Sequence, residues 1–345
     1  MSLGPAATGA VQAGSPHRDR PQTARTARAG GIDLMIRVGA YVAVAVVLGY
    51  FSVAAHGFFS LSNVVNVVEQ SAILGILAFG MTLVVIAGGM NVVSGGIDLS
   101  IAANMGVCAA VFATSINAGV SDPVAVALTL GAGLAIGAVN AFAVIGLGVL
   151  PLLATLAVMN VCIGAELVLT QNTVISAASP LISLMSSGTF LGISVYAWFL
   201  IVASALFIVL VQYTRWGLRL YAVGAHREAA HAAGSPIAKY QAASYVIAGL
   251  CGSLAALLSV ARLSGSSPGA NDNLLPVIVA ALMGVVFSRR MVPTIGGTLL
   301  SALFIGFLAN GFQLINVSSY WVNGVQGLLI LAVVSMTSLT KRAGT

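Results

Sequence analysis

The chain alternates long apolar runs with short polar segments, and this pattern predicts its elements. After residue 33 the apolar runs are about 20 residues long, which is the length that an α-helix needs to cross a bilayer. A transmembrane barrel would alternate apolar and polar residues, and these runs do not. The pattern predicts ten spans, at residues 35–56, 63–88, 99–117, 123–146, 151–170, 193–213, 239–262, 274–288, 292–312 and 322–340.

The composition supports a membrane protein. Hydrophobic residues make up 59% of the 345 residues and charged residues only 6%, whereas soluble domains carry roughly 25% charged residues. The fold class that we expect is therefore all-α, a polytopic membrane protein of about ten transmembrane helices. Residues 1–33 lack an apolar period and are rich in Ala, Gly, Pro, Arg and Thr. They predict a disordered cytoplasmic tail ahead of a transmembrane domain at 34–341.

The basic residues set the expected topology. With the N-terminus inside, every Lys and Arg except Arg262 falls on the cytoplasmic side. Cytoplasmic loops carry an excess of these residues, so both termini are predicted to be cytoplasmic. The densest charge lies in the cytoplasmic loop 214–238, where Gly234 and Pro236 end a short helix expected at about 225–233. Such a helix suits docking into a groove of another protein, and a solvated loop that only fixes topology is the alternative.

Repeated glycine patterns raise the hypothesis of a two-half pseudo-repeat. The pattern GGxxLS at 95–100 recurs at 296–301, and two Gly-rich turns end in Asn140 and Asn310. The second pair lies on spans of opposite direction, as an inverted repeat requires. The offsets of the two pairs disagree, so the pseudo-repeat stays a hypothesis.

The segment between the second and third expected spans interrupts the helical pattern. The sequence GGMNVVSGGIDLS at 88–100 holds two Gly-Gly pairs, each followed by an apolar residue and then Asn or Asp. Gly-Gly allows positive φ and ends a helix, and Asp98 or Asn91 can cap the next helix. The alternative is a broken helix that lines a pathway, because irregular backbone at membrane depth needs a cavity or a protein partner. The candidates for a helix break or a path are Gly88, Gly89, Asn91, Gly95, Gly96, Asp98, Asn140 and Asn310.

The sequence argues against an enzyme. It contains no Gly-Lys dipeptide and hence no P-loop, no HExxH motif and no Ser-His-Asp arrangement. Glu69 and Glu166 are acids that an ion-coupled carrier or channel could use inside its spans. Both are expected toward the outer ends of their spans, near water, so a stand-alone carrier remains the alternative. Cys108, Cys162 and Cys251 show no metal spacing and are interpreted as core residues, so no metal is expected.

Several motifs together resemble one family. GMTLVVIAGG at 80–89, followed by GGIDLS, and LPLLATL at 150–156 resemble segments of the permease subunits of bacterial ATP-binding-cassette sugar importers, of the ribose, xylose and arabinose type. The TRWG, YAVG and EAA…G segments of the 214–238 loop resemble the TRFG…YAIGGN…EAA…G loop of that family. The NG at 310–311 and the VSSYW at 317–321 resemble its NGL…GVSSYW run. The likeness is collinear over most of the chain.

The resemblance implies a transport subunit of the bacterial inner membrane. Two copies, as a homodimer, would form the translocation pathway for a monosaccharide, a pentose or a hexose, that a periplasmic binding protein delivers. Separate cytoplasmic ATPase subunits would bind ATP and Mg, so no cofactor is expected in this chain, and no nucleic acid is expected as a partner. The residues that match the family's coupling-loop motif are Arg215, Gly217, Gly224, Glu228, Ala229, Ala230 and Gly234.

Neutral polar side chains within the spans suit a transient path for a neutral sugar, and hydrogen bonding between helices is the alternative role for each. They are Asn91, Asn140, Asn310 and Gln326.

The chain departs from the family pattern at two places. The family carries one GGIDLS close behind GMT. Here Asn91 takes that Asp position in an ungapped alignment, and the intact GGIDLS follows seven residues later. We favour an insertion of seven residues, because all six residues of GGIDLS survive. The family's Gly-rich GGTSLxGGxG segment is largely replaced by a stretch with Arg289 and Arg290, which leaves the partner or the substrate subclass open.

Overall fold

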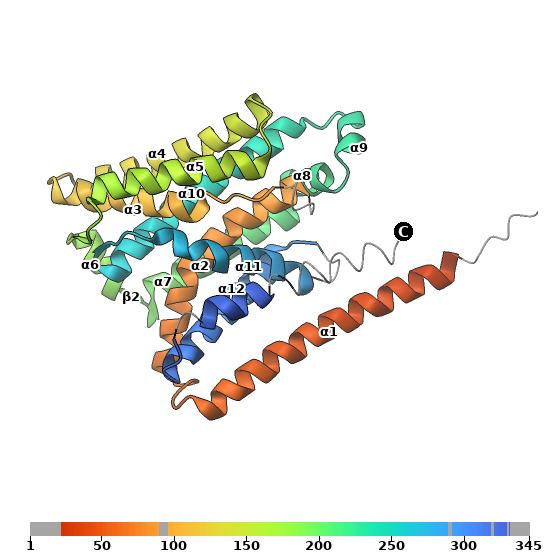
Figure 1. Cartoon of the computed structure of the whole chain (residues 1–345), viewed down its shortest axis with the longest axis horizontal. Coiled ribbons are helices and arrows are strands. Elements are labelled where there is room, and N and C mark those ends of the chain that lie inside the picture. The colour runs from red at the N-terminus through yellow and green to blue at the C-terminus, as the bar shows by residue number, and fades with distance from the viewer. Residues whose placement is uncertain (1–21, 90–95, 289–291, 319–320, 330, 332–345) are drawn as a thin grey trace, which may run out of the picture.

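The computed structural model of the chain is a bundle of apolar helices (Figure 1). It describes residues 22–89, 96–288, 292–318, 321–329 and 331, with side chains from residue 37 onward. Within these residues, seven helices are long and apolar enough to cross a membrane. Two shorter apolar helices, Ile101–Asn117 and Ala270–Val286, fall on the third and eighth expected spans. The expected all-α polytopic membrane fold is therefore confirmed in its class.

The elements follow one another with short connections. In chain order they are α1 (Gln22–Ala54), α2 (Leu61–Gly88), α3 (Ile101–Asn117), α4 (Asp122–Ala141), η1 (Phe142–Gly146), α5 (Pro151–Thr170), β1 (Ile175–Ser176), α6 (Pro180–Ser187), β2 (Thr189–Phe190), β3 (Ile193–Ser194), α7 (Val195–Ile208), η2 (Val209–Tyr213), α8 (Arg215–Ala225), α9 (Arg227–Ala232), α10 (Ile237–Leu263), β4 (Gly265–Ser266), η3 (Ala270–Asn273), α11 (Leu274–Val286) and α12 (Ile295–Leu314).

Every expected span before residue 313 coincides with a helix, and the differences lie at the two ends of the chain. The tenth expected span, 322–340, falls on the helical residues 321–329 and 331, and its other residues lie outside the described part. The boundary expected between the tail and the transmembrane domain at residue 33 stays a prediction, and the structure describes helix α1 from Gln22 onward. The segment ahead of the apolar run contains Gln, Ala and Arg, which favour a helix. Residues 1–21 lie outside the described residues.

Helix α2 is the central element of the bundle. It packs against α10, α12, α11, α7 and α8, and all of its residues from Gly75 to Ala87 are buried. Close packing with α10 depends on small residues, since a side chain at Gly80 would come within 2.9 Å of Cys251 Cβ. Helices in membranes approach closely where small residues face one another. Cys108, Cys162 and Cys251 are all buried, as expected for core residues.

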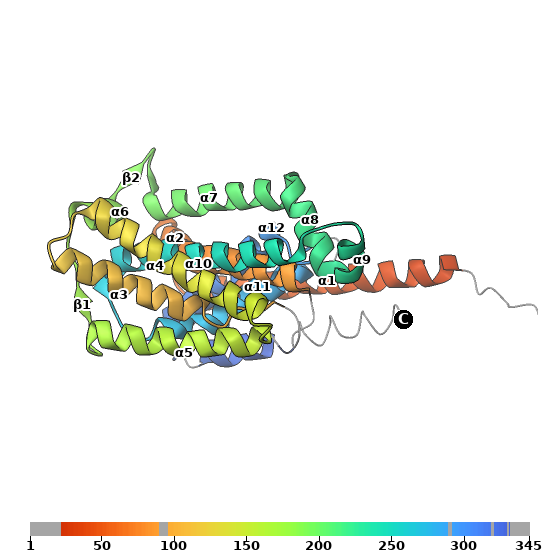
Figure 2. The ribbon, with the colours of Figure 1, turned by 90° about the horizontal axis from the view of Figure 1, so that it is seen from above.

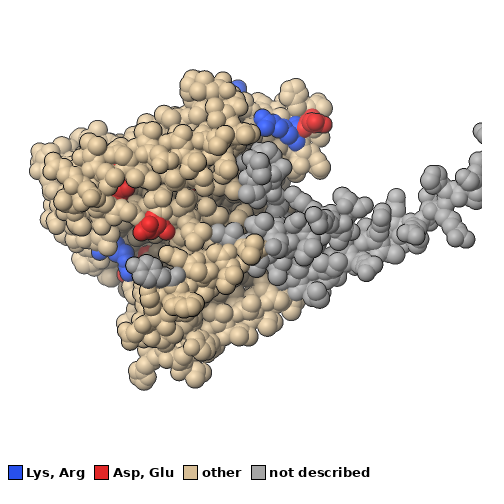
Figure 3. All heavy atoms as spheres, viewed as in Figure 1, with Lys and Arg blue, Asp and Glu red and all other residues tan. Residues whose placement is uncertain are grey.

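The two ends of the bundle differ in their connections. At one end β1 pairs with β4, and β2 pairs with β3 next to α6. At the other end lie α8 and α9, and we call this the α8–α9 end. Helix α1 starts on the side of the α8–α9 end and runs toward the opposite end (Figures 1 and 2). On the face drawn in Figure 3 most of the surface is uncharged, and basic and acidic residues are visible in two places, at the α8–α9 end and toward the opposite end.

Candidate translocation and coupling site

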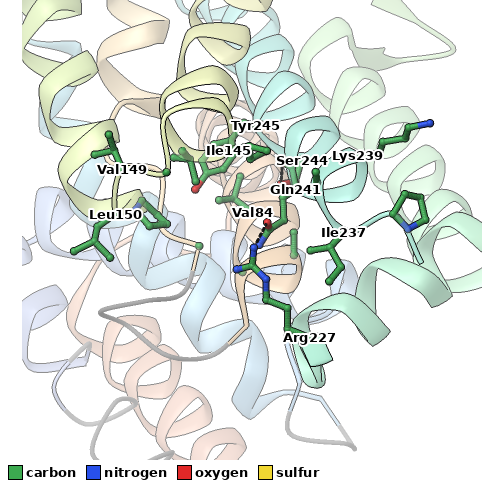
Figure 4. Close-up of a pocket in the computed structure, with 18 of the residues that line it drawn as sticks. Val84, Ile145, Val149, Leu150, Arg227, Ile237, Lys239, Gln241, Ser244 and Tyr245 are labelled. Atoms are coloured by element: carbon green, nitrogen blue, oxygen red, sulfur yellow. Dashed lines mark hydrogen bonds between the residues drawn. The ribbon is translucent and has the colours of Figure 1, made fainter. Parts of the chain in front are cut away.

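A cavity opens at the α8–α9 end of the bundle. Its volume is about 760 Å³, and its walls come from the end of α2, the connection from η1 to α5, and the segment from α9 into α10. Gly88 and Gly96, two of the helix-break candidates, line it. Arg227 of α9 reaches toward α10, where its Nη2 donates to Gln241 Oε1 at 3.3 Å, whereas Lys239 extends away from the cavity (Figure 4). We call this the inner cavity.

Asp98 does not cap α3 in the way that the sequence predicts. Its side chain is 2% exposed. Its Oδ1 accepts hydrogen bonds from the backbone N–H of Ser100 at 2.9 Å and from the Ser100 hydroxyl at 2.6 Å. Ser100 is itself the residue before the first turn of α3, so Asp98 stabilises the turn that leads into α3 rather than the free N–H groups of the helix. The cap predicted from local sequence is therefore corrected to a turn.

Asn140 joins the same cluster from α4. Its Nδ2 donates to Ser100 Oγ at 2.7 Å and lies 3.4 Å from Asp98 Oδ1. The structure thus brings together two candidates, Asp98 and Asn140, that are 42 residues apart in the chain. Both side chains are buried, and both bond to the hydroxyl of Ser100. Asn140 therefore has the hydrogen-bonding role that the sequence analysis gives as the alternative to a path.

Two segments of the sequence resemblance meet at this cluster. Thr155 of the LPLLATL segment accepts a hydrogen bond from Leu99 N at 3.1 Å, and its hydroxyl lies 3.3 Å from Ile97 O and 2.9 Å from Pro151 O, the two carbonyl oxygens to which it can donate. Gly96 passes so close to α2 that an added Cβ would overlap the carbonyl oxygen of Val84. The segment GIDLS is therefore held between α2 and α5. Gly95 and Asn91 lie outside the described residues, so whether Asn91 or Asp98 takes the family's Asp position stays a prediction.

Burial raises the pKa of Asp98 from 3.8 to about 6, against the opposing effect of the hydrogen bonds from Ser100. The folded protein then holds this proton more tightly than the unfolded chain, so its contribution to stability is largest below about pH 4 and is lost as the pH rises to about 6. We expect Asp98→Asn to remove this slope, since Asn keeps an acceptor oxygen for Ser100 but does not ionise. Apparent melting temperatures of both proteins in detergent between pH 4 and pH 7 test this, and parallel curves would contradict it.

The coupling-loop residues form two short helices rather than the one expected. Helix α9 corresponds to the expected helix at about 225–233, and Gly234 follows it with a φ of 75°. Helix α8 was missed by the sequence analysis. Thr214 precedes it as the N-cap, where its Oγ1 accepts from Gly217 N at 3.3 Å, and α8 buries Leu220 and Val223 on one face. The apolar positions three residues apart are the signal that could have found it.

Helix α8 contacts the helix break directly. A Cβ added to Gly224 would overlap the carbonyl oxygen of Ile86, and a Cβ added to Gly89 would lie 2.6 Å from Gly224 O. The backbone of α8 therefore rests on the last turn of α2. Tyr221 of the same helix donates to Pro293 O at 2.7 Å, so α8 also contacts the connection between α11 and α12. The helix-break candidates and the coupling-loop candidates, which are far apart in the sequence, are therefore in direct contact.

The remaining coupling-loop candidates differ in exposure. Ala230 is buried, whereas Arg215, Glu228 and Ala229 are exposed. Small and charged side chains on these two helices thus face outward at the α8–α9 end.

Asn310 lies apart from the other path candidates. Its Oδ1 accepts from Asn63 Nδ2 at 2.7 Å and its Nδ2 donates to Asn63 Oδ1 at 3.0 Å, which joins the end of α12 to the start of α2. Both lie toward the end opposite α8 and α9, so Asn310 has the interhelical bonding role.

The two acids of the alternative carrier hypothesis have different surroundings. Glu69 Oε2 lies 3.6 Å from Arg262 Nη1, and both side chains are about a quarter exposed. Glu166 is only 2% exposed, so the expectation that it lies near water is wrong. Its carboxylate packs against Gly106 and interacts with the backbone N–H groups of Gly269 and Ala270. The connection from α10 to α11 covers it, which the pattern of α5 alone does not reveal.

These features define a multi-pass helical membrane protein whose polar side chains gather at a break between two helices, beside a cavity and a pair of surface helices. Residues 63–334 match the family model described as "Branched-chain amino acid transport system / permease component".

Relatives support the same class. The ribose import permease protein of Escherichia coli (strain K12) is 33% identical over 298 residues, which cover 85% of this chain and 91% of that protein. Its counterpart in Bacillus subtilis (strain 168) is 32% identical over 304 residues, covering 87% and 92%. The autoinducer 2 import system permease protein of Photorhabdus luminescens is 27% identical over 298 residues, covering 86% and 88%. No solved structure matches the chain.

The chain therefore belongs to this family of transport-system permease components. The resemblance to sugar-import permeases that its motifs indicate is confirmed. A permease component is a transport subunit rather than an enzyme.

Proposed function

We propose that this chain forms the translocation pathway of an ATP-driven importer for a monosaccharide in the bacterial inner membrane. In this proposal both termini are cytoplasmic, about ten helices span the bilayer, two copies form the pathway, and the two-half pseudo-repeat remains a hypothesis. ATP and Mg bind to a separate ATPase and not to this chain. A periplasmic binding protein delivers the sugar to the end opposite α8 and α9.

The contact between α8 and α2 carries this proposal. Gly224 of α8 rests on the backbone of Ile86 and Gly89 at the end of α2, and α8 and α9 present exposed side chains at the same end. A protein bound to α8 and α9 would therefore push on the end of α2 and on the inner cavity beside it. Because the backbones touch without an intervening side chain, little of that movement would be absorbed.

The choice of a sugar as the transported substrate is supported by the relatives rather than by the family model. Two relatives of about one-third identity are ribose import permeases, whereas the description of the family model refers to branched-chain amino acids. A branched-chain amino acid is a zwitterion and calls for charged partners, and the buried side chains of the helix-break cluster other than Asp98 are neutral. We therefore propose a neutral sugar, with a branched-chain amino acid as the second candidate.

The need for an ATPase separates this proposal from a stand-alone carrier. We expect vesicles that contain this chain alone to take up no D-ribose or D-xylose under either a sodium or a proton gradient. Vesicles that also contain the ATPase and the binding protein should take up the sugar when ATP is inside. Uptake of radiolabelled sugar over time measures both. Gradient-driven uptake by the chain alone would refute the proposal, and uptake of L-leucine but no sugar by the complete system would replace the substrate.

A further inference from the structure

A second cavity lies toward the end opposite the inner cavity. Its volume is about 240 Å³, about eight times the roughly 30 Å³ that one water occupies in the liquid. It is lined by residues of α2, α3, α10, α11, α12 and the helical segment 321–329, and we call it the outer cavity. Among its lining residues are Ser71, Leu74, Arg262, Asn273, Gly306 and Gln326.

Two buried polar groups in this lining lack a partner. Ser71 is 0% exposed and Gln326 is 2% exposed. Neither Ser71 Oγ nor Gln326 Oε1 has a hydrogen-bond partner among the residues that the structure describes. Buried polar groups in proteins are nearly always bonded, and exceptions indicate a group that something else satisfies.

The hydroxyl of Ser71 differs from those of other buried helical residues. Thr82 and Ser301 donate to the carbonyl oxygen one turn earlier, at Ala78 and Gly297. Ser71 makes no such bond within the described structure. Opposite it stands Gly306, where an added Cβ would overlap Ser71 Oγ. The missing side chain on α12 thus leaves the space that the hydroxyl needs at the cavity wall.

Gln326 also stands out among the neutral polar residues that the sequence singles out. Asn140 and Asn310 donate to other side chains, and Asn91 lies outside the described residues. Asn140 Oδ1 also lacks a partner among the described residues, but of these three residues only Gln326 lines one of the two cavities. Its amide oxygen is therefore available to a ligand.

The charge of the outer cavity is balanced. The guanidinium of Arg262 lies 3.6 Å from Glu69 Oε2 and donates to Asn66 Oδ1 at 2.9 Å. The unpaired groups are a hydroxyl and an amide, and Leu74, Ile73 and Met105 add apolar surface. Neutral hydrogen-bonding groups next to apolar walls match a molecule with hydroxyl groups and C–H faces, and they do not match a zwitterion.

We propose that the outer cavity is a binding site for a neutral monosaccharide, with Ser71 and Gln326 bonded to its hydroxyl groups. The choice of a sugar rests on the proposed function. Helix α2 lines both cavities, and its residues 75–83 between them are buried. Leu74 and Val84 are about 15 Å apart along the helix at a rise of about 1.5 Å per residue. The outer cavity is thus a separate site that the sugar occupies before it reaches the inner cavity.

The test compares three single variants of the full chain in lipid nanodiscs. Ser71→Ala and Gln326→Leu remove the unpaired groups. Ser253→Ala is the matched control, because Ser253 is equally buried on α10, lines neither cavity and donates to Leu250 O at 2.9 Å. Binding of D-ribose at millimolar concentration is measured by saturation-transfer NMR, with L-leucine as the comparison ligand. Apparent melting temperatures and sugar uptake by the complete transport system are measured in parallel.

The two cavity variants should weaken ribose binding without lowering the melting temperature, and the control variant should do the reverse. We expect Ser71→Ala and Gln326→Leu to weaken ribose binding by about threefold to tenfold, the effect of one hydrogen bond, and to slow uptake. Their melting temperatures should stay equal or rise, because no protein hydrogen bond is lost. Ser253→Ala should melt at a lower temperature and bind ribose like the parent.

The other possible outcomes show whether the outer-cavity site or the proposed transport function is wrong. If both variants bind ribose like the parent, the site is refuted, and ribose uptake by the complete system would still support the proposed function. If leucine binds and ribose does not, the sugar site is refuted. If ribose binding is lost in both variants while the complete system moves no sugar, the site stands and the proposed substrate fails.

Discussion

Replacing Gly224 with alanine should stop most transport while the ATPase still binds. The added Cβ would overlap the carbonyl oxygen of Ile86 and lie 3.3 Å from Gly89 N. Backbone atoms cannot rotate away, so α8 must move off the last turn of α2. Overpacking of this kind costs about 1–3 kcal/mol. We expect uptake to fall roughly tenfold or more, which corresponds to about 1.4 kcal/mol.

A glycine with free space provides the control for this variant. Gly164 lies within α5, and an added Cβ there would meet nothing within 4 Å. Gly164→Ala should stabilise the protein by about 0.4–1 kcal/mol through the unfolded state and leave uptake unchanged.

Three measurements separate coupling from simple misfolding. Affinity capture of the ATPase should be retained by Gly224→Ala, because the exposed side chains of α8 and α9 remain. The number of ATP molecules hydrolysed per sugar transported should rise, and the melting temperature should fall by only a few degrees. Parental uptake with parental stability would show that the contact between α8 and α2 does not transmit movement.

The spans could be predicted from the sequence because each depends on its own composition. An apolar run of sufficient length must form a helix in a bilayer, where no water can satisfy its backbone. The start of α1 shows the limit of this rule, since the residues from Gln22 onward are helical without being apolar. Helix α8 was missed for a related reason, because its 11 residues are too few to span a bilayer and the length of an apolar run does not reveal it.

The contacts of the candidate site could not be predicted in the same way. Gly224 and Gly89 both belong to recognisable motifs, but that their backbones touch follows from the packing of α8 on α2. Asp98 could cap α3 by local rules, but it bonds to Ser100, and Asn140 of α4 joins the same cluster from a distant part of the chain. Local sequence identifies which residues are unusual, and the tertiary structure decides what they bond to.

Glu69 and Glu166 are the acids that a stand-alone carrier could use. We expect replacing Glu166 to have the second large effect, on protein stability rather than on ion coupling. Glu166→Ala should destabilise the protein by about 1–3 kcal/mol, the cost of leaving buried donors unpaired. The donors are the backbone N–H groups of Gly269 and Ala270 at the start of η3. Glu69→Ala should cost less than about 1 kcal/mol, because its partner Arg262 is partly exposed and such pairs are weak.

Variants of the same two acids test the carrier hypothesis. A carrier that bound its coupling ion at a buried carboxylate would lose the dependence of uptake on the ion gradient when that carboxylate is removed. We expect uptake by the complete system to be independent of sodium and proton gradients in the parent, in Glu69→Ala and in Glu166→Gln, which keeps the shape of the buried side chain. Uptake with and without ionophores measures this. If the parent depends on a gradient and Glu166→Gln, at parental stability, does not, then Glu166 holds the coupling ion and the ATPase is not the source of energy.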